Sequence, residues 1–143
     1  MFFGSQHHQL DAKNRFRVPS KYRGKFGDVI YLTRGSDKCI YVFGEESVKE
    51  LLFDRFKDVG IIGNKNLIEA KRLISANTFD VTDDGQGRFI LPEALLKHAA
   101  ITKNIVSVGA GNWLEIWGEE AWEEYNNKKN NYDELIEALV IGE

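Results

Sequence analysis

Two stretches of the chain share one skeleton: DAKNRFRVP at residues 11–19 and DGQGRFILP at residues 84–92. In both, an aspartate is followed four residues later by an arginine, the arginine is followed directly by a phenylalanine, and a proline closes the stretch. Self-similarity at a fixed offset indicates a duplicated structural unit. The repeated turn, with its one acid and one arginine, is therefore the feature from which the fold is predicted.

The repeat continues beyond these stretches. CIYVFGEE at residues 39–46 aligns with WLEIWGEE at residues 113–120, and Gly35 aligns with Gly109. The two blocks occur in the same order in both halves, with a one-residue change of offset between them. They predict a unit of about 45 residues that occurs twice.

Each unit is predicted to contain four strands. HQLDAK enters a tight turn and RFRVP leaves it as a hairpin, with Phe16 and Val18 on one face and Arg15 and Arg17 on the other. Gly85 and Gly87 would supply positive φ in the second turn; Asn14 would do so less easily. VIYLTRG with CIYVFG, and IVSVGAG with WLEIWG, are predicted as two further hairpins.

Helices are predicted around this β structure. Pro19 and Pro92 suit the starts of short helices over SKYRGKF and EALLKHA. Further helices are expected over EESVKELLFDRF, NKNLIEAKRLISANTF (with Phe79 on its apolar face), EEAWEEY and YDELIEALVI. Neither unit alone has a sufficient core. The expected fold class is therefore α+β, with a small barrel-like β core built from two copies around a local two-fold axis.

The composition indicates a folded protein with an uneven charge distribution. Residues 1–38 contain eight Lys or Arg and three acidic residues, whereas residues 115–143 contain two and nine, within a net charge of −3. A basic front suggests an anionic partner, although soluble proteins often have such unequal ends. The single cysteine, Cys39, and the absence of a signal-like or membrane-spanning run favour a soluble cytoplasmic protein without a membrane partner.

Most candidate chemical sites have simpler explanations. His7, His8 and His98 lack the spacing of a zinc site, and the acidic run at residues 115–124 is better interpreted as a solvated helix face. The glycine pairs at residues 85–87 and 109–111 precede strands and not helices, so they resemble turns more than phosphate loops. Cys39 has no identifiable base. No catalytic set, metal site or cofactor is predicted, and an enzyme with a small-molecule substrate is disfavoured.

The duplicated Asp-x-x-x-Arg is the exception. A local ion pair across a turn is one explanation, but such pairs contribute little when exposed. The functional interpretation is that two related turns present Arg15 and Arg88 on one surface, because arginine suits bidentate contact with guanine or phosphate. Asp11 and Asp84 would orient the guanidinium groups. Phosphate contacts could come from the nearby basic residues Lys13, Arg17, Lys21 and Arg23.

Three motifs together resemble the MraZ family of bacterial transcriptional regulators, which have two SpoVT-AbrB-type units. They are MFFGSQHHQLDAKNRFRVPSKYR, DDGQGRFILPEALLKHA and GAGNWLEIWGEEAW, and the resemblance covers nearly the whole chain. It implies an AbrB-like swapped-hairpin or double-ψ-type β core. The units would span residues 5–47 and 76–119, with connecting helices at 48–75 and a helical tail at 120–143.

The resemblance also implies a function and a site. The chain would form a ring-shaped homo-oligomer that associates with the nucleoid and binds direct repeats in the promoter of the division and cell-wall gene cluster. The DNA-binding residues would be Asp11, Lys13, Arg15, Arg17, Lys21, Arg23, Asp84, Gln86 and Arg88. Asn14 and Leu96 depart from the family pattern of glycine and a basic residue, so the first turn could differ and the second unit could hold phosphate less strongly.

A function of a different class is also compatible with the sequence. AbrB-like antitoxins bind a partner protein, usually through a disordered C-terminal arm. Here residues 76–122 are predicted to be a second folded unit, which counts against this alternative. Gel shifts with promoter DNA and pull-downs of protein partners would separate the two functions.

Overall fold

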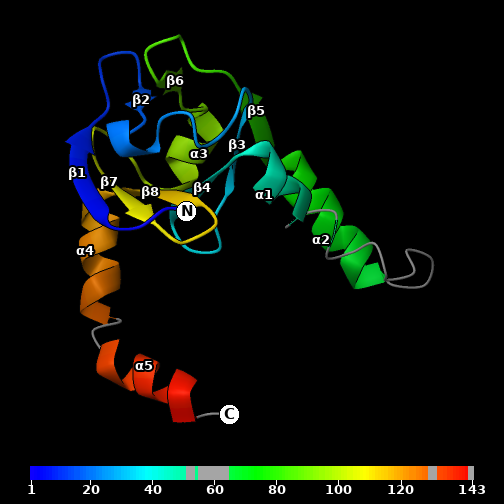
Figure 1. Ribbon diagram of the computed structural model, residues 1–143, viewed down its shortest axis with the longest axis vertical. Helices are drawn as coiled ribbons and strands as arrows, with labels where there is room; N and C mark the ends of the chain where they lie inside the picture. Colours follow the sequence, from blue (N-terminus) through cyan, green and yellow to red (C-terminus); the bar gives the residue numbers. More distant parts are fainter. Residues whose placement is uncertain (51–53, 55–64, 129–131, 142–143) are drawn as a thin grey trace.

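A computed structural model gives the arrangement of the chain (Figure 1) and describes residues 1–50, 54, 65–128 and 132–141. The strands are β1 (Ser5–Gln9), β2 (Arg15–Arg17), β3 (Ile30–Arg34), β4 (Cys39–Phe43), β5 (Thr78–Val81), β6 (Arg88–Ile90), β7 (Asn104–Gly109) and β8 (Leu114–Gly118). The helices are a 3-10 helix (Ser20–Tyr22), α1 (Glu45–Lys49), α2 (Lys65–Ala76), α3 (Glu93–His98), α4 (Glu119–Lys128) and α5 (Tyr132–Ile141). The predicted α+β class is confirmed.

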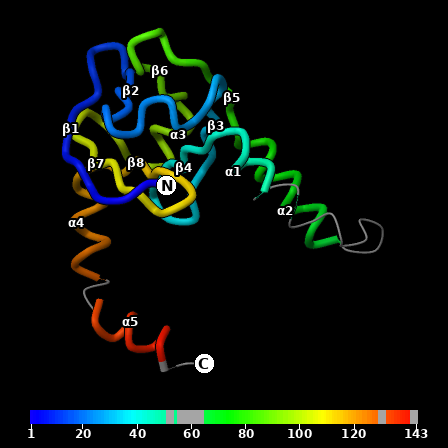
Figure 2. Tube along the Cα trace, viewed as in Figure 1, coloured from blue at the N-terminus to red at the C-terminus, as the bar shows by residue number. Residues whose placement is uncertain are grey.

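Six strands form one antiparallel sheet in the order β1-β7-β8-β4-β3-β5. The two predicted hairpins, β3–β4 and β7–β8, lie at its centre and pair with each other through β4 and β8. The sheet is open, since β1 and β5 have a neighbour on one side only. α2 extends outward from the body on one side, and α4 and α5 extend from it on the other (Figure 2).

The two halves of the chain exchange their outer strands. β1, from the first half, pairs with β7 of the second, with His7 opposite Val106. β5, from the second half, pairs with β3 of the first, with Leu32 opposite Phe79. The halves therefore share one sheet and one core.

The remaining strands, β2 and β6, form a two-stranded ribbon in which Phe16 lies opposite Phe89. Both phenylalanine side chains are buried, and their ring centroids are 5.3 Å apart. They belong to a core cluster that also contains Val18 and Leu91, the next inward positions of the two copies. The ribbon is thus anchored by its inner face to the core of the six-stranded sheet.

Two predictions of strand pairing were wrong. β1 does not form a hairpin with β2, and β5 does not form one with β6. Each aspartate turn reverses the chain, but the strand after it pairs with its counterpart in the other half. This exchange brings Phe16 and Phe89 into contact, which two separate hairpins would not require.

The helices differ from prediction mainly at their ends. α2 ends at Ala76, and Phe79 lies in β5 instead of on the helix. SKYRGKF forms only the 3-10 helix, because Gly24 and Gly27 take positive φ values of 80° and 83° after it. Most of EESVKELLFDRF beyond α1 falls outside the described residues.

Candidate nucleic-acid interface

The carboxylates of the two aspartate turns accept equivalent hydrogen bonds. Asp11 Oδ1 accepts from the backbone N–H groups of Lys13 and Arg15, both at 2.9 Å. Asp84 Oδ1 accepts from the backbone N–H groups of Gln86 at 2.9 Å and Arg88 at 3.2 Å. Each carboxylate therefore holds its own loop closed, and the sequence repeat corresponds to a structural repeat.

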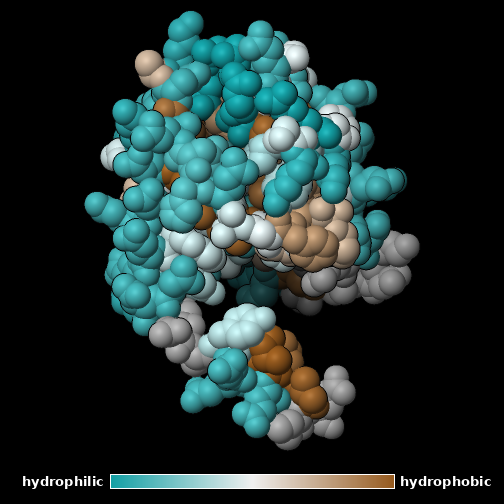
Figure 3. Space-filling view, turned by 60° about the vertical axis from the view of Figure 1, so that its left-hand side comes forward, coloured by the Kyte–Doolittle hydropathy of each residue, from teal (hydrophilic) through white to brown (hydrophobic). Residues whose placement is uncertain are grey.

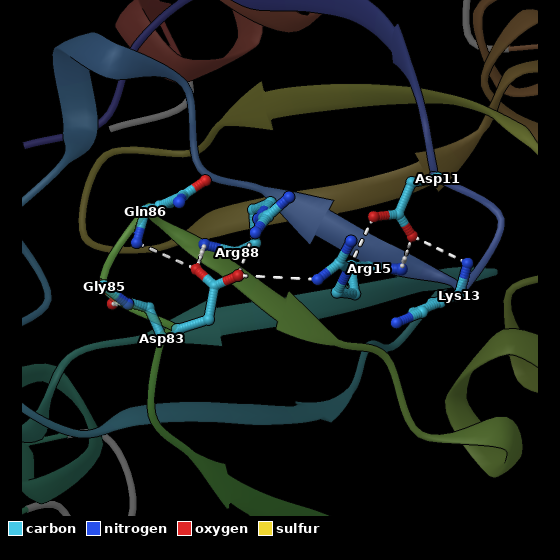
Figure 4. Close-up of polar contacts among 8 residues, drawn as sticks. Asp11, Lys13, Arg15, Asp83, Gly85, Gln86 and Arg88 are labelled. Carbon is cyan, nitrogen blue, oxygen red and sulfur yellow. Dashed lines mark hydrogen bonds and ion pairs between the residues drawn. The ribbon is translucent and has the colours of Figure 1, made fainter.

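Each aspartate also holds the arginine that follows it. Arg15 Nε donates to Asp11 Oδ2 at 2.6 Å, and Arg88 Nε donates to Asp84 Oδ2 at 2.7 Å. Arg15 Nη1 lies 3.7 Å from Asp84 Oδ2, which links the two turns (Figure 4). The aspartates hydrogen-bond to the Nε atoms, so neither outer nitrogen of Arg88 is bonded to its aspartate. Arg15 Nη1 faces Asp84, but at 3.7 Å it is beyond hydrogen-bond distance, so it can still donate together with Nη2 in a planar two-point contact.

The outer face of the ribbon carries Arg15, Arg17, Arg88 and Ile90. The Val18 N–H donates to the Gly87 carbonyl and the Leu91 N–H to the Asn14 carbonyl, on either side of the ribbon. Because hydrogen-bonded and non-hydrogen-bonded pairs alternate in antiparallel strands, Arg15–Ile90 and Arg17–Arg88 are the close, non-hydrogen-bonded pairs.

The Arg17–Arg88 pair places two positive charges opposite each other. Like charges directly across a strand pair destabilise a sheet. Arg88 is partly compensated by Asp84, whereas Arg17 is exposed and has no ion pair within the described part of the chain. An anion bound on this face would relieve the repulsion.

Both aspartates stay ionised more readily than usual. The hydrogen bonds of Asp11 with Arg15, above all the one from its backbone N–H, lower the pKa of the Asp11 carboxyl. Partial burial raises the pKa of Asp84, but the backbone N–H groups of Gln86 and Arg88 and the Arg88 guanidinium together outweigh it and leave that pKa lowered. The turns therefore keep their ion pairs throughout the physiological pH range.

The turns match although Asn14 replaces glycine in the first one. Asn14 has φ = 56° and Gly87, its counterpart, has φ = 75°. Asparagine tolerates this left-handed region better than most residues. The turns nevertheless differ slightly, as predicted: the Asn14 N–H donates to the Asp11 carbonyl at 3.0 Å, whereas in the second turn the Gly85 N–H donates to Asp83 Oδ1 at 2.6 Å.

The other predicted residues lie around the ribbon. The exposed Lys13 and Gln86 occupy equivalent turn positions. Arg23 lies against the second turn, with its Nε 3.4 Å from the Val18 carbonyl and only 2.8 Å from where a Cβ on Gly87 would be. Lys21 is exposed, but its ammonium donates to the Phe3 carbonyl at 3.2 Å and lies over the Tyr22 ring.

Ile90 was absent from the predicted site although it lies on the same face. Its side chain is 60% exposed, opposite Arg15. The repeat could have predicted this position, because Ile90 aligns with Arg17 and also points outward.

The alternative chemical sites have structural explanations. His8 bonds to Ser107, and His98 to the Asp37 carbonyl. Burial raises the pKa of the Cys39 thiol, which disfavours a thiolate nucleophile. Within the described residues, no group of three His, Cys, Asp or Glu could hold a metal ion, and none of the helices is long and apolar enough to cross a membrane.

Comparisons with known proteins place the chain in one family. A family model described as "MraZ protein, putative antitoxin-like" matches residues 1–52 and 74–139. The chain is 36% identical to the transcriptional regulator MraZ of Clostridium tetani and 37% identical to that of Clostridium acetobutylicum. In both cases the alignment covers 97% of this chain and 96% of the relative. The corresponding protein of Thermoanaerobacter pseudethanolicus is 34% identical, with the same coverage.

The left-handed conformation of Asn14 generates a first prediction. Asn14→Ala should lower the free energy of unfolding by about 1–2 kcal/mol, because alanine is strained in this region, whereas Asn14→Gly should change it little. Chemical denaturation would measure both, with the exposed Lys13→Ala as control. Equal stability of the alanine and glycine variants would contradict the turn geometry.

Proposed function

The chain belongs to the MraZ family and is thus a transcriptional regulator, and we propose that it binds double-stranded DNA through the outer face of the β2–β6 ribbon. The major groove of B-DNA admits a two-stranded ribbon. The observation that carries the proposal is the outward set of Arg15, Arg17 and Arg88, including a like-charge pair that an anion would stabilise.

The residues of the ribbon divide into two roles. Arg15 and Arg88 would read base edges, because their Nε atoms are fixed by Asp11 and Asp84 and their outer nitrogens match guanine. Phosphate and sugar contacts would come from the surrounding residues Lys13, Arg17, Arg23 and Gln86. Lys21 would contribute least, since its ammonium already bonds to the Phe3 carbonyl.

We further propose that the core is of the AbrB-like swapped-hairpin, double-ψ type, with units at residues 5–47 and 76–119. The exchange of β1 and β5 between the halves supports this assignment. Residues 48–75 would connect the units, and residues 120–143 would form a helical tail. The target would be the promoter repeats of the division and cell-wall gene cluster, so the protein would act in the cytoplasm at the nucleoid.

Self-association into a ring is the third part of the proposal. α5 carries an apolar stripe on one side (Figure 3), and Tyr132, Leu135, Ile136, Leu139 and Val140 are all 45% or more exposed. This spacing places them on one helix face. Such a stripe needs a covering surface, and a second copy of the chain would provide one.

An antitoxin-type module that binds a partner protein is the alternative. The words "antitoxin-like" in the family description favour it, as does an apolar groove of about 620 Å³. The groove lies between α2 and the sheet, and its lining includes Tyr41, Phe43, Leu73 and Trp113. Capture of one stoichiometric protein partner, without a gel shift of promoter DNA, would favour this alternative.

The two arginines should contribute unequally to DNA binding. Arg15→Ala should abolish specific binding, since each lost base contact costs about 1–3 kcal/mol per subunit. Arg88→Ala should weaken binding less, because the first copy has Lys13 and Arg17 beside it where the second has Gln86 and Ile90. Titration of cognate duplex would measure this, with circular dichroism and mass as controls for folding and assembly. Wild-type affinity of Arg15→Ala would refute the assignment.

In the same titration, Asp11→Asn distinguishes whether Asp11 orients Arg15 or only repels DNA through its negative charge. Removing a negative charge from a DNA-facing surface should strengthen non-specific binding. If Asp11 orients Arg15, the same change should weaken specific binding. An increase in both affinities would show that Asp11 only repels DNA.

Salt should weaken the complex steeply. If several subunits together make about 6–10 phosphate contacts, affinity should fall by about 10³–10⁵ between 50 and 200 mM salt. Fluorescence anisotropy at increasing salt would measure the slope. A nearly flat response would mean that the basic ribbon does not face phosphate.

The α5 stripe should determine the assembly state. Wild type should be larger than a dimer at micromolar concentration, and the double change Leu135→Glu with Leu139→Glu should reduce the mass because it charges the apolar face. Light scattering would measure both, with Glu134→Gln on the polar face as the matched control. A monomeric wild type would contradict self-association, and an unchanged mass of the double variant would contradict the role of α5.

A further inference from the structure

One large apolar side chain stands on the cationic face of the ribbon. Ile90 is 60% exposed, while the other exposed large apolar side chains of the described residues belong to the N-terminal residues, α2 or α5. It lies directly opposite Arg15 in a non-hydrogen-bonded pair. Two such side chains have Cβ atoms about 4.5–5.5 Å apart, so they occupy neighbouring places on the surface.

The local symmetry makes this position informative. Ile90 corresponds to Arg17 of the first copy, and both point outward from the ribbon. Isoleucine suits a strand in general, but an exposed one buries little area and so contributes little to the core. It also cannot contact phosphate as Arg17 would. The two copies therefore present different chemistry at one equivalent place.

We propose that Ile90 contacts the C5-methyl group of a thymine in the major groove and makes the protein select thymine there. This inference rests on the proposed DNA binding by the ribbon. The thymine methyl is the apolar feature of the major groove, and apolar side chains read it. Successive base pairs are about 3.4 Å apart. A side chain next to Arg15 therefore reaches the base pair beside the guanine that Arg15 reads, or the one after it.

Replacement of thymine by deoxyuridine tests the contact, since it removes only the methyl group. The probe is a fluorescein-labelled duplex covering the promoter repeats of the division and cell-wall gene cluster, with each thymine replaced in turn. Wild-type affinity should fall about three- to fivefold at one or two positions in each repeat, the loss expected for one buried methyl group. Ile90→Ala should bind the thymine and deoxyuridine duplexes equally at those positions.

Two variants at the same position control for other effects. Ile90→Val keeps a branched apolar side chain and should retain most of the methyl preference. Ile90→Arg restores the symmetry with Arg17; it should lose the preference and increase the salt dependence by about one phosphate contact. Both should fold like wild type by circular dichroism and thermal melting, because position 90 is largely exposed.

The possible results distinguish this inference from the proposed function. Wild type that binds the duplex but ignores every deoxyuridine replacement overturns the role of Ile90 and leaves DNA binding intact. A methyl preference that persists in Ile90→Ala assigns the thymine contact to another residue and also overturns it. Wild type that does not bind the promoter duplex at all overturns both.

Discussion

The contact between Phe16 and Phe89 is the constraint on which the site depends. These rings meet inside the core, 5.3 Å apart, because β2 and β6 pair with each other and not with the strands before them. The residues that alternate with them must then point outward on one common surface. A single buried pair thus brings together two turns that are 73 residues apart in the sequence.

The two aspartates order the arginine side chains that the buried pair brings together. A two-stranded ribbon is marginal alone, and arginine side chains lose much rotamer freedom when they are ordered. Asp11 and Asp84 reduce that freedom in advance, because each bonds both to its loop backbone and to the Nε of its arginine. The ion pair between Arg15 and Asp84 further couples the two turns. The site is therefore ordered before any ligand arrives, which lowers the entropic cost of binding.

Much of this arrangement follows from the sequence, but the strand partners do not. The repeat predicts the duplication, and the apolar runs predict the hairpins β3–β4 and β7–β8. Alternation also correctly places Phe16 inside and Arg15 outside. Alternation fixes the face of a residue without fixing which strand lies beside it, and SQHHQ in β1 has no apolar pattern to choose a partner. The exchange of strands between the halves depends on how the whole core closes, which local patterns do not encode.

Divergence between the two copies has physical consequences for recognition. A symmetric ribbon would read both directions of a site equally, whereas Arg17 and Ile90 at equivalent places give it a polarity. The direct repeats that we propose as the target would require such polarity, since every half-site faces the same way. The same divergence limits the positive charge of one ribbon, because Ile90 stands where the first copy has Arg17. The adjoining turns carry two aspartates, and the whole chain has a net charge of −3. One ribbon alone would then bind weakly, and the proposed self-association would let several copies engage successive repeats together. Under the proposed function, asymmetry within the chain and association between chains would together allow an oriented, repeated DNA site to be read.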